Sequence, residues 1–296
     1  MADRFGATPG RLDAVVAARL GAARTDVQRA IEAGDVRVDG EIRPKSYRLV
    51  GGEQIDVDLA PAAALVPEGP PLEVRFRDEH LLVLSKPAGV PTHPTENHRS
   101  GTVVNRLLGM GVPLARRGAP LRPGIVHRLD AGTSGLLVVA STDAAAETLA
   151  DLFAAHGADR RYLALVRGSV QHDRFEVDAP LDRRGASIRV STLGRAASTG
   201  FEVRERLPRA TFLEAVPRTG RTHQIRVHLS SVGHPILGDA RYRGAGEDAN
   251  ALGLQRPFLH AWRIAFDHPV TGERVDLEEP LPGDLLAALD RARRSA

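Results

Sequence analysis

Cysteine is missing from the 296-residue chain. Its absence excludes disulfides, thiolate nucleophiles and cysteine-ligated zinc or iron–sulfur centres, and it agrees with a reducing cytosol. The chain also starts without the apolar core of a signal peptide, and no apolar run approaches the ~20 residues that span a bilayer. We therefore expect a soluble, cytoplasmic protein with no membrane partner.

Lysine is almost as scarce, because it occurs only at Lys45 and Lys86. The 40 basic residues narrowly outnumber the 37 acidic ones, for a formal net charge of +3. A GC-rich genome explains the preference for arginine, but clustered arginines still form forked contacts with phosphates. An acidic partner is therefore plausible, although no glycine-rich nucleotide-phosphate loop is present.

Residues 1–59 have the pattern of a small α/β module. Val16 and Leu20 belong to one helical apolar face, and a second helical stretch follows it. A short alternating strand at 36–38 then meets Asp39-Gly40, a strong hairpin turn signal. A further alternating strand closes the module.

This order of helix, helix, strand and turn resembles the RNA-binding domain first seen in ribosomal protein S-four. The resemblance rests on Arg11-Leu-Asp13, Ile31, Gly34-Asp-Val36, Val38 and Asp39-Gly40. It implies that basic side chains of the module contact RNA, and the candidates are Arg11, Arg24, Arg29, Arg37 and Lys45. The alternative is that these are ordinary solvated charges between acidic neighbours.

Residues 60–71 contain four prolines and should form an extended, semi-rigid linker. We place the domain boundary there, so that the second domain covers residues 72–296. Several short alternating strands between 175 and 216 predict an antiparallel meander. Helical spacing over 143–155 adds a helix, which gives an α+β class for the whole chain.

The first chemical motif is His127-Arg-Leu-Asp130, on a loop that begins at Pro123-Gly124. Small polar residues follow it, and Leu136–Ala140 reads as a buried strand. A carboxylate held on a loop that feeds a rigid core strand is a common catalytic arrangement. The alternative is that the aspartate only forms a turn.

A second motif spans residues 219–239. Its apolar residues recur at helical spacing until Gly233, which predicts a helix over 222–232. His223 and His228 do not share one ligand face, and no carboxylate completes a zinc triad. We therefore predict no metal site.

Together the motifs resemble the RluA-type RNA pseudouridine synthases. The resemblance rests on His127-Arg-Leu-Asp130, on the following Thr133-Ser-Gly-Leu-Leu-Val-Val-Ala140, on Gly220-Arg-Thr-His-Gln-Ile-Arg-Val-His228, and on Lys86-Pro-Ala-Gly89. It implies an α+β catalytic domain built on a long mixed, mainly antiparallel sheet with a cleft across it. It also implies that no cofactor or metal is required.

The resemblance assigns roles to particular residues. Asp130 is the expected catalytic residue, as nucleophile or as base at the ribose, and Tyr162 should pack against the target base. Arg221 should pair with Asp130, with Arg226 as the second choice. RNA contacts are expected for His127, Arg128 and Arg226, and Arg128 would fill the space left by the flipped base.

These residues predict an enzyme that isomerises uridine in RNA, with large-subunit ribosomal RNA favoured over tRNA, acting as a monomer. Ala131-Gly132 replaces a common pair of Lys and an acidic residue, which puts substrate detail in doubt. One alternative is an inactive RNA-binding protein of the same fold. Another is a glycoside-type hydrolase, but no motif supplies its second carboxylate.

Overall fold

Two units, Met1–Ala64 and Leu65–Ala296, make up the chain. The computed structural model describes residues 2–20, 24–58, 65–95, 98–118, 121–185 and 187–294. None of the described helices is both long and apolar enough to cross a membrane.

The small unit packs two helices against an antiparallel sheet of order β1–β5–β3, with β2 and β4 as a separate pair. Its elements are β1 (Ala2–Gly6), β2 (Gly10–Arg11), α1 (Leu12–Leu20), α2 (Arg24–Ala33), β3 (Val36–Val38), β4 (Arg48–Leu49) and β5 (Gln54–Asp58). Leu12 and Ile31 meet Ile55 in the core. Asp39 and Gly40 have φ of 51° and 82°, as the turn signal requires.

The large unit is framed by a nine-stranded sheet of order β10–β13–β14–β9–β15–β8–β7–β6, with β16 also beside β15. β8 and β15 run parallel, and the other neighbouring pairs are antiparallel. The predicted long, mainly antiparallel sheet is therefore confirmed. Its strands are β6 (Glu73–Arg77), β7 (Leu81–Lys86), β8 (Ser134–Ala140), β9 (Asp159–Arg167), β10 (Arg174–Asp178), β13 (Ser198–Arg206), β14 (Ala210–Pro217), β15 (Leu259–Asp267) and β16 (Arg274–Glu278).

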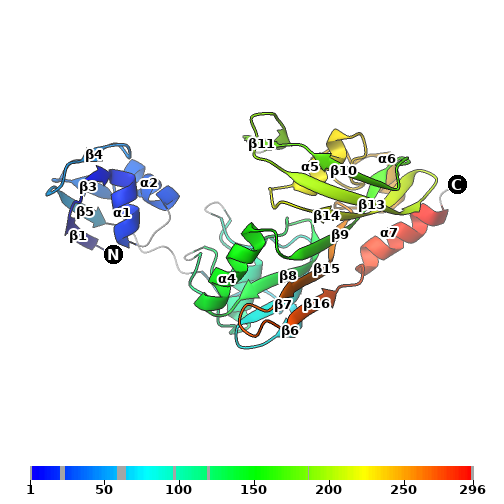
Figure 1. The fold of residues 1–296 in the computed structure, drawn as a ribbon, viewed down its shortest axis with the longest axis horizontal. Helices are drawn as coiled ribbons and strands as arrows, with labels where there is room; N and C mark the ends of the chain where they lie inside the picture. Colours follow the sequence, from blue (N-terminus) through cyan, green and yellow to red (C-terminus); the bar gives the residue numbers. More distant parts are fainter. Residues whose placement is uncertain are drawn as a thin grey trace. The chain divides into compact units, whose positions relative to one another are not determined.

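Helices and one hairpin complete the large unit (Figure 1). They are α3 (Val103–Gly109), α4 (Asp143–Ala154), the hairpin of β11 (Leu181–Arg184) and β12 (Ser187–Val190), α5 (Gln224–Ser231), α6 (Glu247–Ala251) and α7 (Gly283–Arg294). The helix expected over 222–232 begins at Gln224, because His223 before it adopts a left-handed φ of 56°.

Strand β8 is buried along its whole length because both faces of the sheet are covered there. Leu137 and Val139 enter one core, while Leu136 and Val138 enter the other, where they meet α4. Gly135 has a φ of 113°, and a Cβ at this position would lie 2.1 Å from the carbonyl oxygen of Ala261. Only glycine therefore allows β15 to approach β8 closely where the first motif enters the sheet.

The proline-rich stretch 60–71 lies partly outside the described residues, which resume at Leu65. Its second half is attached to the large unit. Asn105 of α3 donates from Nδ2 to the carbonyl of Val66, and the backbone N–H of Glu68 donates to the carbonyl of Asn105. We propose that the second half of this stretch belongs to the large unit rather than to a linker.

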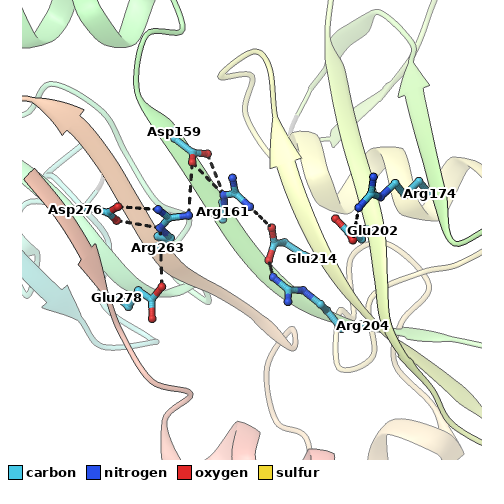
Figure 2. A network of polar contacts seen from close by, with 9 residues as sticks. All are labelled: Asp159, Arg161, Arg174, Glu202, Arg204, Glu214, Arg263, Asp276 and Glu278. Atoms are coloured by element: carbon cyan, nitrogen blue, oxygen red, sulfur yellow. Dashed lines mark hydrogen bonds and ion pairs between the residues drawn. The ribbon is translucent and has the colours of Figure 1, made fainter. Parts of the chain in front are cut away.

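Alternating charges cover part of the sheet surface across β9, β13, β14, β15 and β16 (Figure 2). Glu214 on β14 lies at the centre, with a side chain that is 1% exposed. It accepts a hydrogen bond from Arg161 Nη1 at 2.9 Å and pairs on its other oxygen with Arg204. This carboxylate therefore balances the positive charges of two arginines on neighbouring strands.

Glu214→Gln should destabilise the large unit, because it keeps the shape but removes a charge partner from both Arg204 and Arg161, although Arg161 keeps its pair with Asp159. We expect a loss of roughly 2 kcal/mol, below the 3–5 typical of fully buried pairs, since both arginines reach water. Denaturant unfolding followed by circular dichroism measures it. Glu202→Gln, which breaks an exposed pair with Arg174, is the matched control; equal losses in the two variants would contradict the assignment.

Candidate active site

Asp130 lies on the loop before β8, and its side chain is 17% exposed. The loop is fixed by Thr92, whose hydroxyl donates to the carbonyl of Leu129 at 2.7 Å and accepts from its N–H. Asp130 Oδ2 accepts a hydrogen bond from Arg226 Nη1 at 2.9 Å. The carboxylate is therefore held in place while one edge of it stays open.

Arg226 projects from α5, and a second carboxylate, that of Asp239, holds its guanidinium in place. Its Nε and Nη2 donate to both carboxylate oxygens of Asp239, at 2.6 and 2.9 Å, and Asp239 is fully buried. The ring of Tyr242 lies 5.0 Å from the guanidinium carbon. Although burial opposes it, the hydrogen bonds and charge of Asp239 raise the pKa of Arg226 above its usual range. Arg226 is thus a permanent cation with its remaining N–H edge aimed at Asp130.

This geometry corrects the first choice of ion-pair partner. Arg221 donates from Nε to the carbonyl of Ala196 at 3.0 Å, and burial and the charge of Arg195 lower its pKa. Because His223 has a left-handed backbone, helix α5 begins only at Gln224, and Arg221 lies three residues before it, outside the helix. Arg226, the second choice, faces Asp130 instead. Arg221 still lines the pocket beside the catalytic candidate.

His223 faces the other oxygen of Asp130, with Nε2 3.9 Å from Oδ1. Its Nδ1 lies 2.7 Å from the hydroxyl of Tyr242, which also accepts from the backbone N–H of Ile188. When the His223 proton lies on Nε2, the side that faces Asp130, the Tyr242 hydroxyl donates to Nδ1. Burial lowers the pKa of His223, which favours its neutral form.

Asp130 borders two pockets. One, of about 290 Å³, is lined by Tyr162, Arg221 and Arg226, with apolar walls from Phe153 and Ile225. Tyr162 on β9 is buried, and burial raises the pKa of its phenol. The other, of about 600 Å³, has a basic wall that holds His93, Arg128, Arg241 and Arg256. The structure thus brings Asp130, Tyr162, Arg221 and Arg226 together.

The remaining predicted RNA-contacting residues differ in their surroundings. Arg128 is exposed and lines both pockets. His127 is held inside: its Nε2 accepts from the N–H of Val138 at 2.9 Å and its ring stacks on Phe153 at 4.3 Å. Burial lowers the pKa of His127 to about 3, so the ring is neutral.

Within the small unit, Arg11 and Arg24 share the buried carboxylate of Asp13, and their hydrogen bonds lower its pKa well below the usual range. Arg37 is exposed, and Lys45 pairs with Glu32 at 2.7 Å. The side chain of Arg29 lies outside the described residues.

Lys86 sits under the Asp130 loop, fully buried. Its Nζ donates to the carbonyls of Pro87 and Val90 at 2.8 Å and of Ala131 at 3.2 Å. It thereby ties two loops of the cleft together. Burial lowers the pKa of Lys86 to about 7, against the opposing charge of Asp130.

Sequence reasoning assigned no role to Asp239, His93, Arg160 or Arg256. Asp239 is part of the second motif, and its position directly after Gly238 is the feature of the sequence that could have indicated a role for it. Arg160 precedes Tyr162 by two residues and so shares its strand face. Nothing in the sequence indicated a role for Arg256. Among the described residues there is no cluster of three or more His, Asp or Glu side chains that could hold a metal ion.

Family models match both units. Residues 80–231 match the RNA pseudouridylate synthase model, and residues 10–55 match the S4 domain model. Both motifs of the cleft begin within the first of these ranges, so the match includes Asp130, Tyr162 and Arg226.

Named relatives extend over most of the chain. An uncharacterized RNA pseudouridine synthase of Bacillus subtilis, YlyB, is 38% identical over 92% of this chain and 90% of its own length. Ribosomal large subunit pseudouridine synthase D of Zymomonas mobilis is 42% identical over 78% of this chain and 76% of its own.

Solved structures agree with the sheet. Human RNA pseudouridylate synthase domain containing 4 superposes with a TM-score of 0.58 at 25% identity, and covers 75% of this chain and 93% of its own. Human RNA pseudouridylate synthase domain containing 1 gives 0.56 at 28% identity, and covers 73% and 86%.

The buried amine of Lys86 should make stability depend on pH. Its folded-state pKa of about 7 lies below the unfolded value of 10.5, so the unfolded chain binds more protons between these values and stability rises with pH there. Relative to Lys86→Met, the wild type should gain about 2 kcal/mol from pH 7 to 9. Urea unfolding of both proteins at the two pH values measures it; parallel pH profiles would contradict it.

Proposed function

Because this chain belongs to the RNA pseudouridylate synthase family, of RluA type, and carries an S4 domain, we propose that it modifies large-subunit ribosomal RNA with Asp130 as its catalytic residue. Enzymes of this family are isomerases that convert uridine in RNA to pseudouridine. The observation that carries the residue assignment is the chain of contacts from Asp239 through Arg226 to Asp130, at the mouth of a pocket with Tyr162 on its wall.

The reaction replaces one bond by another. The C1′–N1 bond breaks and its electron pair stays on N1, the base turns, and C5 then bonds to C1′. The C5 proton is lost and N1 gains one, so no atom is added and no redox change occurs. Asp130 either attacks C1′ or removes a proton from the ribose, and Arg226 holds the carboxylate in place for both routes.

The target base must leave its stack to reach Asp130. Tyr162 offers an aromatic face for it inside the pocket. Arg128 is exposed beside the Asp130 loop and would fill the vacated space or hold the backbone. We assign Arg221, at the same pocket, to RNA contact rather than to the Asp130 pair.

The small unit would read RNA through its basic side chains. Asp13 orients Arg11 and Arg24 side by side, and Arg37 projects from β3 into solvent. Ribosomal RNA is favoured over tRNA because several relatives carry the name of a large-subunit enzyme. Mapping pseudouridines in a deletion strain distinguishes the two. We propose that the enzyme acts in the cytoplasm as a monomer.

Asp130→Asn tests the function directly, because it keeps the shape of the side chain and removes its charge. We expect single-turnover pseudouridine formation to fall by more than about 1,000-fold, while RNA binding is kept. Asp151→Asn, an exposed change on α4, is the control and should react normally. Turnover by Asp130→Asn at the wild-type rate would refute the catalytic assignment.

The two arginines of the second motif should respond differently to substitution by lysine. Arg226→Lys keeps a charge but loses the fork that joins Asp239 to Asp130, so the single-turnover rate should fall about 100-fold. Arg221→Lys should leave that rate close to wild type and affect RNA affinity instead. Equal rate losses would show that Asp130 does not depend specifically on Arg226.

A further inference from the structure

Arg160 is a buried cation that is poorly paired in the part of the chain that the structure describes. The residue is 9% exposed, and its Nε and Nη2 have no acceptor among the described residues. Its guanidinium carbon lies 5.8 Å from the ring centre of Phe153. Such a contact uses the face of the group and leaves the in-plane N–H bonds unpaired. Burying an unpaired charge is costly, so the position calls for a functional reason.

The location of Arg160 supplies that reason. It lies two residues before Tyr162 on β9, so both side chains point to the same face of the strand. Both line the pocket of about 290 Å³ that Asp130 borders. The charge of Arg160 also acts on the Tyr162 phenol, where it opposes the effect of burial on the pKa. The unpaired cation therefore belongs to the space that receives the base.

His127 adds a second unpaired donor to this pocket. Its Nε2 accepts from Val138, so the neutral ring carries its proton on Nδ1, which is buried and has no acceptor among the described residues. His127 and Arg160 both contact the ring of Phe153. Two unpaired N–H groups therefore lie buried behind this wall of the pocket.

A cation in this wall suits a base that becomes negatively charged. Uracil carries such a charge, on its O2 and O4 oxygens, once its bond to the ribose is broken. The detached base is therefore the group that this wall would stabilise.

We propose that the charge of Arg160, in the wall of this pocket, stabilises the flipped uracil while it is detached. When C1′–N1 breaks, N1 keeps the electron pair and the ring carries one negative charge, spread onto O2 and O4. Asp130 loses its own charge in the same step, by forming a bond to C1′ or by taking a proton. The charge passes from Asp130 to the base, and Arg160 lies where it arrives. This inference rests on the proposed function.

Arg160→Met in the full-length enzyme tests the proposal, with RNA that carries either uridine or 5-fluorouridine at the target position. Fluorine at C5 stabilises the uracil anion, so cleavage then depends less on an enzyme cation. Single-turnover loss of the target nucleoside should fall about 100-fold with uridine, and severalfold less with 5-fluorouridine. Arg160→Lys should lie between Arg160→Met and wild type, and Arg174→Met, an exposed arginine on β10, should match wild type.

Stability separates this role from a structural one. Removing an unpaired buried charge should leave the midpoint of urea unfolding unchanged or raise it. Equal rate losses with both RNAs, a wild-type rate for Arg160→Met, or a lowered midpoint would overturn the proposal. Each rate is compared with active wild type, so failure here is distinct from failure of the Asp130 assignment.

Discussion

The cleft depends on one buried carboxylate. Asp239 accepts two hydrogen bonds from Arg226 and two more from the backbone N–H groups of Arg241 and Tyr242. The edge formed by Nε and Nη2 is thereby committed to Asp239, and Nη1 donates to Asp130. An arginine held in this way orients a partner without the entropy cost that a free surface side chain would carry.

The sheet makes this arrangement possible by joining distant segments. Asp130 is delivered by the loop before β8, Tyr162 by β9 and Arg226 by the helix after β14. β15 separates β8 from β9 in the sheet and runs parallel to β8, with a close approach that requires Gly135. Because β8 is buried on both faces, the loop that it anchors cannot shift without disturbing two cores.

Much of the fold and of the candidate site was predictable, because both depend on short sequence patterns. Turn residues and alternation indicated the strands, and the family resemblance made Asp130 and Tyr162 site candidates, which the structure brings to one pocket. The partner of Asp130 was not predictable, since it depends on where α5 begins, and the left-handed backbone of His223 shifts that start to Gln224. The burial of Arg160, and the lack of a partner for its Nε and Nη2 among the described residues, could not be predicted either, because both depend on how Phe153 of α4 packs.

The charges around the pocket are arranged along the path of the reaction. At one end Asp130 faces Arg226, whose charge is shared with the buried Asp239. In the wall shared with Phe153, Nε and Nη2 of Arg160 have no hydrogen-bond partner among the described residues. A uridine bound between Asp130 and Arg160 would release the charge of its base toward this cation. An environment arranged before the bond breaks stabilises the transferred charge without having to reorganise, which is the most effective way for a protein to accelerate such a step.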